Sequence, residues 1–122
     1  MNNDTTTKEP RRRAAVSQAG QLAGYLEEWP DDTWSFVYLD DYQGTPVSLT
    51  MPLQVEPYHF SSFPPVFEGL LPEGPQLESL LRLHKIDRSD SFRQLVTVGA
   101  DMVGSLTVKE VADRSVKELD ER

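Results

Sequence analysis

Cysteine is absent from this 122-residue chain, and histidine occurs only as His59 and His84. The lack of cysteine excludes disulfide bonds and thiolate zinc sites, and two histidines are too few for a histidine-rich metal site. Asparagine is confined to Asn2 and Asn3, so the chain lacks the metal-binding asparagine that follows the catalytic aspartate of a kinase. Motifs of serine hydrolases, zinc peptidases and phosphate-binding loops are missing as well. We therefore expect a protein that is not an enzyme and holds neither a metal nor a cofactor.

Long hydrophobic runs are also absent. No apolar stretch reaches the roughly 20 residues that span a bilayer, and the N-terminus lacks the hydrophobic segment of a signal peptide. We expect no contact with a membrane and a cytoplasmic location. The length suits one domain with two tails: a disordered arm over residues 1–13, a domain over residues 14–110 and a charged tail over residues 111–122.

Basic residues are too few to balance the acidic ones, and the net charge at pH 7 is −8. Residues 1–13 hold four basic and two acidic side chains, whereas residues 14–122 hold eight basic and 18 acidic ones, a net charge of −10. A negative body repels a phosphate backbone, so we expect no direct nucleic-acid binding by the domain. The charge suits a basic protein partner, and it is equally consistent with a surface that only maintains solubility. The Arg11–Arg13 run offers nucleic-acid contact as an alternative, but a solvated tail is the simpler interpretation.

The first half of the body has the pattern of β-strands. Four segments predict strands, over residues 14–16, 22–26, 33–39 and 47–51. A turn at residues 18–21 joins the first two. Trp34, Phe36 and Tyr38 share one face of the third strand. Because no Lys or Arg lies near it, this face fits a core better than a stacking platform for single-stranded nucleic acid.

The second half has the pattern of helices, followed by a final strand over residues 104–108. The helices are expected over residues 65–70, from Pro75 onward, and from Ser89 or Asp90 onward. In the second helix one face carries Leu77, Leu80, Leu81 and His84. In the third the buried stripe is Phe92, Leu95 and Val96, and Gly99 suits the left-handed C′ position. We therefore expect an α+β fold: a small, mostly antiparallel β-sheet with about three short helices packed on one side.

The residues that could carry chemistry have simpler explanations. His59 lies in an expected loop, and no oriented nucleophile is evident near it. His84 lies at the end of a predicted helix, where a positive charge is favourable. Five aspartates suit turns and helix caps better than metal binding, namely Asp40, Asp41, Asp87, Asp90 and Asp101.

One stretch, Leu70-Leu71-Pro72-Glu73-Gly74-Pro75, is unusually constrained and joins two predicted helices. As an ordinary connection it would bury its leucines, but Glu73 and Gln76 are expected to point outward from a rigid turn. Rigid turns suit recognition because little conformational entropy is lost on binding. We therefore predict a partner-binding surface made of Glu68, Gly69, Leu71, Pro72, Glu73, Gly74, Pro75 and Gln76.

These motifs resemble a known family. Val47-Ser48-Leu49-Thr50-Met51-Pro52-Leu53, Glu56-Pro57-Tyr58 and Phe67-Glu68-Gly69-Leu70-Leu71-Pro72-Glu73-Gly74 are similar to the N-terminal subdomain of HipA-type serine/threonine kinase toxins. The family pattern runs S-L-S-L-P-L, then F-F-x-N/G-L-L-P-E/D-G, and ends with G-R-D-x-x-G, which here reads Gly99-Ala100-Asp101-Met102-Val103-Gly104. Ala100 stands in place of the family's basic residue and Thr50 in place of its second serine.

The resemblance implies a module separated from its enzyme, similar to the HipS-like antitoxins of bacterial HipBST toxin–antitoxin systems. It implies two partners in a ternary complex, a HipT-like kinase toxin and a HipB-like DNA-binding protein. The expected role is a non-enzymatic antitoxin that docks on the N-terminal lobe of the kinase and inhibits it. The alternative is a structural module that bridges the kinase to the HipB-like repressor without inhibiting it.

Overall fold

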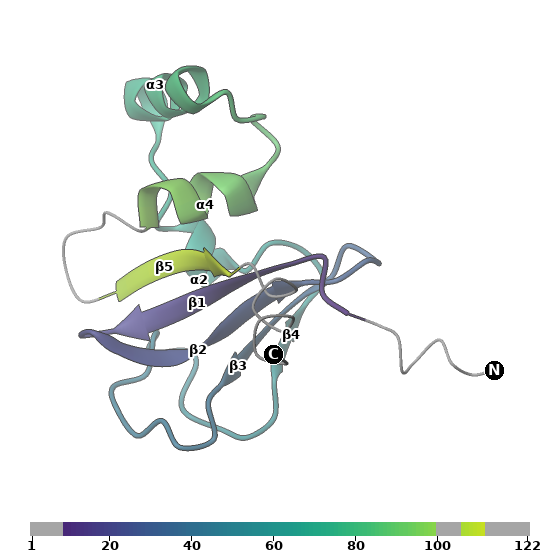
Figure 1. Ribbon diagram of the computed structural model, residues 1–122, viewed down its shortest axis with the longest axis vertical. Helices are drawn as coiled ribbons and strands as arrows, with labels where there is room; N and C mark the ends of the chain where they lie inside the picture. Colours follow the sequence, from purple (N-terminus) through teal and green to yellow (C-terminus); the bar gives the residue numbers. More distant parts are fainter. Residues whose placement is uncertain (1–8, 100–105, 112–122) are drawn as a thin grey trace, which may run out of the picture.

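The computed structural model describes residues 9–99 and 106–111, which form a five-stranded sheet with helices on one side (Figure 1). The strand order is β4-β3-β2-β1-β5, and every neighbouring pair is antiparallel. The strands are β1 (Arg12–Gln18), β2 (Gln21–Glu28), β3 (Trp34–Tyr38), β4 (Tyr58–Phe60) and β5 (Leu106–Val111). The helices are α2 (Pro65–Glu68), α3 (Gly74–His84) and α4 (Ser91–Gly99). The predicted α+β class is confirmed.

The hairpin between β1 and β2 sets the register of the sheet. Its turn places Ala19 at φ 52° and Gly20 at φ 81°, the left-handed pair that suits the twist of a two-residue hairpin. The predicted turn is therefore confirmed. A bulge between Val16 and Ser17 then shifts the pairing by one residue. As a result Arg12 lies opposite Glu28 instead of Glu27.

The inner face of β3 forms the centre of the core. Trp34, Phe36 and Tyr38 are all buried, as predicted for this face. The Phe36 ring lies 4.9 Å from the Tyr38 ring and 5.8 Å from the Phe67 ring of α2, measured between centroids. Trp34 packs edge-on against Phe63 at 4.9 Å. Contacts of this kind contribute roughly 0.5–1.5 kcal/mol each beyond burial, and they hold α2 on the sheet.

The predicted strand over residues 47–51 is wrong, because this segment forms an irregular loop with a turn. The Met51 amide donates to the Ser48 carbonyl at 3.1 Å, and the Thr50 amide donates to the Ser48 hydroxyl at 3.2 Å. Serine and threonine side chains compete in this way with the hydrogen bonds of a β-ladder.

The position predicted for His59 is also wrong. His59 is the middle residue of β4, where it lies opposite Ser35 of β3. The short strand escaped the sequence pattern because three residues are too few to show an alternation.

Helix α3 begins and ends close to the predicted residues but is only loosely packed. Lys85 closes it in the left-handed conformation at φ 56°. Leu77, Leu80 and Leu81 are half-buried, and no residue of the helix is fully buried. Figure 1 shows α3 beyond α4, away from the sheet. Within the described part of the chain, no helix has the length and apolar character that crossing a bilayer requires.

Helix α4 packs closely on β5. The Arg93 amide donates to the Asp90 carboxylate at 3.1 Å, so Asp90 is the predicted cap. The predicted buried stripe is confirmed for Phe92, Leu95 and Val96. The position of Gly99 was predicted wrongly, because Gly99 is a helical residue of α4 and does not have the positive φ of a left-handed C′ residue. A Cβ at Gly99 would lie 2.8 Å from the Val108 Cβ, so glycine is required for the close approach of helix and strand.

The arginines at the start of β1 do not form a solvated run, and that prediction is wrong. Arg13 Nε lies 3.1 Å from a Glu27 carboxylate oxygen, and its guanidinium stacks on the Tyr25 ring at 4.1 Å from the centroid. Arg11 Nη2 lies 3.2 Å from an Asp32 carboxylate oxygen. Pairing with β2 and the loop after it places these cations on the folded domain.

The predicted arm and charged tail at the two ends of the chain lie largely outside the residues that the structure describes. Strand β5 (Leu106–Val111) confirms a final strand that returns to the sheet. Residues 1–8, 100–105 and 112–122 lie outside the described residues, and with them most of the predicted arm, Asp101 and almost all of the predicted charged tail.

Candidate partner-binding surface

The predicted surface lies at the corner between α2 and α3, which we call the α2–α3 corner (residues 68–76). Most of its eight predicted residues are exposed, namely Glu68, Gly69, Glu73, Gly74, Pro75 and Gln76. Leu71 and Pro72 are half-buried. The outward position expected for Glu73 and Gln76 is therefore present. The corner thus combines an apolar base with a polar, accessible tip.

Backbone constraints hold the corner in one shape. The Gly69 amide donates to the Pro65 carbonyl at 3.0 Å, and the Leu71 amide donates to the Glu68 carbonyl at 3.1 Å, so α2 closes in tight turns. Gly74 has a φ of 62°, a left-handed conformation that glycine adopts without strain. Pro75 follows in the first turn of α3, where its fixed φ suits the helix. Little freedom is left to lose when a partner binds.

A hollow of about 220 Å³ lies beside the corner, between it and the start of α4. Its lining residues are Glu68, Leu71, Pro72, Glu73, Leu77, Arg88, Ser91 and Gln94. The volume is below the roughly 300–1,000 Å³ of small-molecule sites, so the hollow suits one or two side chains of a protein partner. Four of these residues lie outside the predicted surface. Leu77 directly follows it in α3, whereas Arg88, Ser91 and Gln94 are brought to the hollow only by the packing of α4 and the loop before it beside the corner.

The loop between α3 and α4 forms the far wall of this hollow. The buried Gln94 amide donates to the Arg88 and Asp87 carbonyls at 3.0 and 3.3 Å and so fixes the loop backbone. Arg88 Nη2 lies 2.8 Å from a Glu78 oxygen, and this hydrogen bond lowers the pKa of Glu78 and raises the pKa of Arg88. Because both side chains are exposed, the pair contributes little stability.

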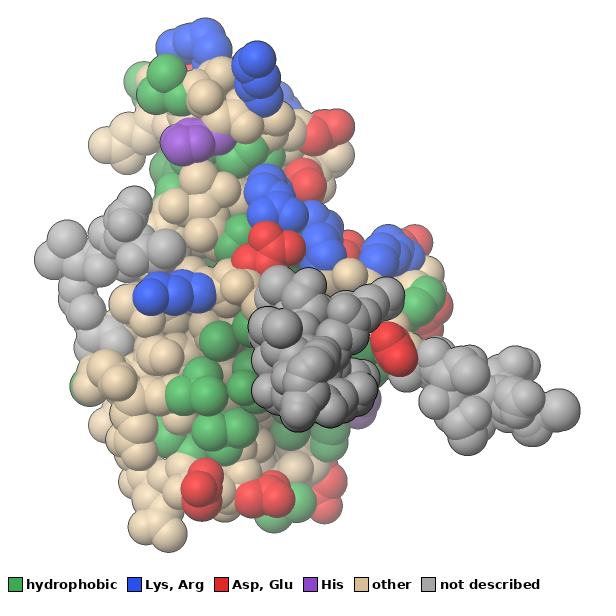
Figure 2. All heavy atoms as spheres, in the orientation of Figure 1, with side chains coloured by type: hydrophobic (Ala, Val, Ile, Leu, Met, Phe, Trp, Pro, Cys, Tyr) green, Lys and Arg blue, Asp and Glu red, His purple; other side chains and the backbone are tan. Residues whose placement is uncertain are grey.

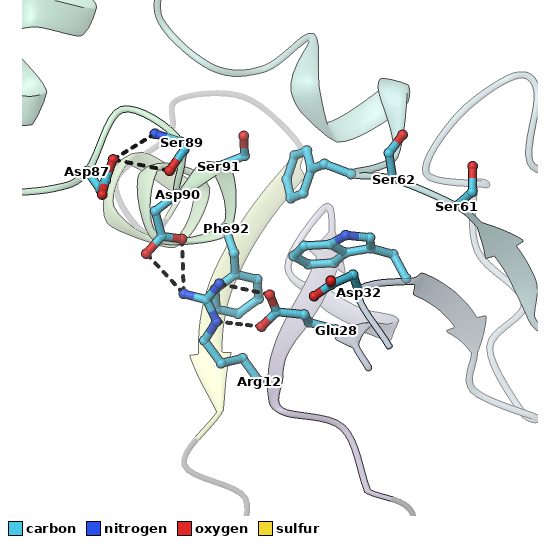
Figure 3. A pocket seen from close by; sticks show the side chains of 12 residues that line it. Arg12, Glu28, Asp32, Ser61, Ser62, Asp87, Ser89, Asp90, Ser91 and Phe92 are labelled. Atoms are coloured by element: carbon cyan, nitrogen blue, oxygen red, sulfur yellow. Dashed lines mark hydrogen bonds and ion pairs between the residues drawn. The ribbon is translucent and has the colours of Figure 1, made fainter. Parts of the chain in front are cut away.

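A larger hollow of about 590 Å³ lies where β1 begins, beside the start of α4 (Figure 3). Arg12 Nε donates to Glu28 at 2.7 Å, and Nη1 donates to Asp90 at 3.0 Å. The guanidinium also lies over the Phe92 ring at 4.6 Å from the centroid. The Glu28 hydrogen bond is the main cause that raises the pKa of Arg12. Arg12 is thus fully engaged as a clamp that joins β1, β2 and α4.

The other candidate residues do not form a common site. His59 and His84 are exposed, on β4 and at the end of α3. Asp40 and Asp41 are exposed turn residues after β3, as expected. In residues 9–99 and 106–111, no three or more His, Asp or Glu side chains are arranged to hold a metal ion.

Charge is unevenly distributed along the molecule. Figure 2 shows Lys and Arg side chains over the upper and middle parts of the molecule, mixed with acidic ones. On this face the opposite end, which carries the loop between β3 and β4, shows acidic side chains without Lys or Arg. Arg82 and Lys85 are exposed on α3 and at its end, whereas Asp40, Asp41 and Glu56 are exposed in that loop. The two ends therefore present surfaces of different chemistry.

Comparison with known proteins gives a consistent assignment. The family model of the HipA N-terminal domain matches residues 14–109. The fold is similar to a solved structure described as the N-terminal domain of HipA toxin, with a TM-score of 0.67 and 36% sequence identity. That match covers 84% of this chain and 95% of the solved one.

Two relatives place the same domain in chains of different size. An uncharacterized protein of Haemophilus influenzae is 38% identical over 100 residues, which cover 81% of this chain and 92% of the relative. The putative kinase Y4mE of Sinorhizobium fredii is 32% identical over 73 residues, which cover 60% of this chain but only 17% of the relative. In one relative the domain makes up nearly the whole protein, and in the other it is a small part.

Proposed function

The chain belongs to the HipA N-terminal domain family, and on that premise we propose that it is a non-enzymatic antitoxin that binds and inhibits a HipT-like serine/threonine kinase toxin. A HipB-like DNA-binding protein completes the proposed complex. The small Haemophilus relative supports a role for the domain outside a kinase chain, and the putative kinase relative supports a link to kinases. The observation that carries the proposal is the exposed and rigid α2–α3 corner.

The proposed mechanism is steric. The domain docks on the N-terminal lobe of the kinase, and the α2–α3 corner reaches toward the nucleotide cleft, where it hinders closure of the phosphate-covering loop. Glu73 competes there for a basic group of the kinase. Two features support this role: the Glu73 side chain is exposed, and the neighbouring backbone is held by Gly74 and Pro75.

The test combines Glu73→Ala and Gln76→Ala in one variant and measures inhibition of a purified HipT-like kinase toxin from the same organism. We expect the concentration needed for half-inhibition of autophosphorylation to rise about tenfold or more, because truncating central interface residues typically costs more than 1 kcal/mol. The two side chains are exposed, so the fold and the unfolding temperature should be unchanged.

The control variant carries Gln21→Ala, which truncates an exposed glutamine at the start of β2, outside the α2–α3 corner and outside the loop between β3 and β4. Equal inhibition by the corner variant and wild type would contradict the proposed mechanism. A stable complex whose kinase activity is undiminished even with wild-type protein would favour the alternative, a bridging module whose acidic surface meets the HipB-like repressor. Absence of any complex would mean that the family relation reports a shared fold without this shared function.

A further inference from the structure

The loop between β3 and β4 exposes apolar side chains that lie outside the α2–α3 corner. Leu49 is 101% exposed, Val55 76% and Leu53 38%. A single exposed leucine is ordinary on a protein surface, but these three fall within seven consecutive residues. We call them the loop patch (Leu49, Leu53 and Val55).

The loop that carries the patch is irregular but well anchored. The Tyr38 hydroxyl donates to the Met51 carbonyl at 2.5 Å and accepts from the Val47 amide at 3.0 Å. The Tyr58 hydroxyl donates to the Pro52 carbonyl at 2.6 Å. The bonds from Tyr38 to Val47 and Met51 lie on either side of Leu49 in the sequence, so they hold the backbone around Leu49 to the core. A segment fixed in this way displays its apolar side chains already in position, which lowers the entropic cost of binding.

A hollow of about 180 Å³ adjoins the patch. Leu53 and Val55 form one wall, and Tyr38 and Tyr42 form part of the other. The volume is below the roughly 300–1,000 Å³ of sites for metabolites and drugs, so it suits a single apolar side chain of a protein.

The rim of the patch indicates the kind of partner. Asp40, Asp41 and Glu56 are exposed in the same loop. A complementary surface would therefore be apolar with a basic border. A second copy of this chain is a poor occupant because it would bring two acidic rims together. A kinase is the better occupant, since the putative kinase relative holds this domain within one much longer chain.

We infer that the loop patch is a docking surface for the kinase toxin, separate from the inhibitory corner. This inference rests on the proposed function. The patch adds binding affinity at the end of the domain opposite to α3, whereas the contacts of the corner are the ones that inhibit the kinase. The two roles are separable by mutation, because the patch and the corner lie at different ends of the molecule (Figure 1).

The experiment measures the affinity of a purified HipT-like kinase toxin from the same organism for this chain by titration calorimetry, together with kinase activity at a saturating concentration of the chain. The test variant combines Leu49→Ser and Val55→Ser, whose wild-type side chains are too exposed to support the fold. The control Gln43→Ser changes an exposed polar residue of the same loop. We expect the Kd to rise about tenfold or more for the double variant, with full inhibition still reached at saturation, and no change for the control.

Each other outcome overturns the inference. If wild type binds and the double variant binds equally well, the patch is not a docking surface, while the proposed function stands. If wild type shows no binding, the proposed function itself fails. If the wild-type chain, measured by sedimentation without the kinase, forms concentration-dependent dimers and the double variant does not, the patch joins two copies of this chain.

Discussion

At the scale of single residues, Tyr38 shows how one side chain can serve both the core and a surface loop. Its ring is buried between the rings of Phe36 and Tyr42, at centroid distances of 4.9 and 5.9 Å. Its hydroxyl bonds the Val47 amide and the Met51 carbonyl. Burial is the main cause that raises the pKa of Tyr38 above its ordinary value of 10.0. The loop between β3 and β4 therefore depends on a hydroxyl that must stay protonated.

We predict that Tyr38→Phe destabilises the protein by about 1–3 kcal/mol at pH 7, because the buried Val47 amide loses its acceptor. Since folding raises the pKa of Tyr38, the wild-type advantage should be fully present below pH 10.0 and be lost as the pH rises through the higher folded-state value. Urea unfolding of both proteins at pH 7, and at pH values above 10.0, would measure this difference.

Tyr25→Phe is the matched control. Tyr25 is half-buried with its ring against Arg13, and its hydroxyl makes no hydrogen bond within the described residues. A change within about 0.5 kcal/mol is expected. Equal effects of the two substitutions would show that the Tyr38 hydroxyl contributes nothing specific.

At the scale of elements, the helices differ in how firmly they are attached. Helix α4 buries its stripe and approaches β5 so closely that Gly99 has no room for a Cβ. Helix α3 has no fully buried residue and relies on half-buried leucines. An 11-residue helix is marginal by itself, so α3 depends on its termini and on the α3–α4 loop for its position. The shape of the α2–α3 corner is thus held by its own backbone constraints, whereas the buried core lies on the sheet side of α4.

Gly99→Ala should destabilise the protein by about 1–3 kcal/mol, because the new methyl group would force α4 away from Val108 of β5. Thermal unfolding followed by circular dichroism would measure the loss. Gly69→Ala is the matched control, since the nearest atom to a Cβ there is 3.6 Å away and the φ of Gly69 is −65°. This control should be neutral or slightly stabilising. An equally stable Gly99→Ala protein would mean that α4 can shift on the sheet at no cost.

At the scale of the whole molecule, net charge and its distribution govern association. The chain carries −8, and the acidic end displays exposed carboxylates beside the loop patch. An acidic surface attracts a basic partner over distances comparable to the screening length, about 10 Å at 0.1 M salt. Electrostatic attraction therefore acts mainly on the rate of association.

We predict that the association rate of this chain with the kinase falls about tenfold between low and high salt, while the dissociation rate changes much less. Stopped-flow or surface-based kinetics at several salt concentrations would test this. A charge-neutral variant of the acidic rim, Asp40→Asn with Asp41→Asn and Glu56→Gln, should lose most of the salt dependence. An association rate independent of salt in wild type would contradict the role assigned to the acidic surface.

Much of the fold could be predicted because local signals and tertiary structure agree. The Ala19-Gly20 turn, the β3 alternation and the α4 stripe each appear in the structure where the sequence places them. Likewise, proline and glycine residues determine the shape of the α2–α3 corner through their own backbone preferences.

Other features depended on contacts between distant residues. The bulge after Val16 shifts the hairpin by one residue and brings Arg12 to Glu28, which no local pattern reveals. Residues 47–51 alternate like a strand, yet they pair with no strand among the described residues, and their backbone is hydrogen-bonded by Ser48 and by Tyr38.

The sequence by itself therefore determined the fold class, the corner and the absence of cysteine chemistry, because these follow from residue type and short-range preference. Tertiary structure alone decided that the terminal arginines become ion-paired clamps, that α3 stays loosely packed, and that Leu49 and Val55 face solvent. The physical reason is that burial and charge pairing depend on which elements pack together. That packing brings into contact residues as far apart in sequence as Arg12 and Asp90.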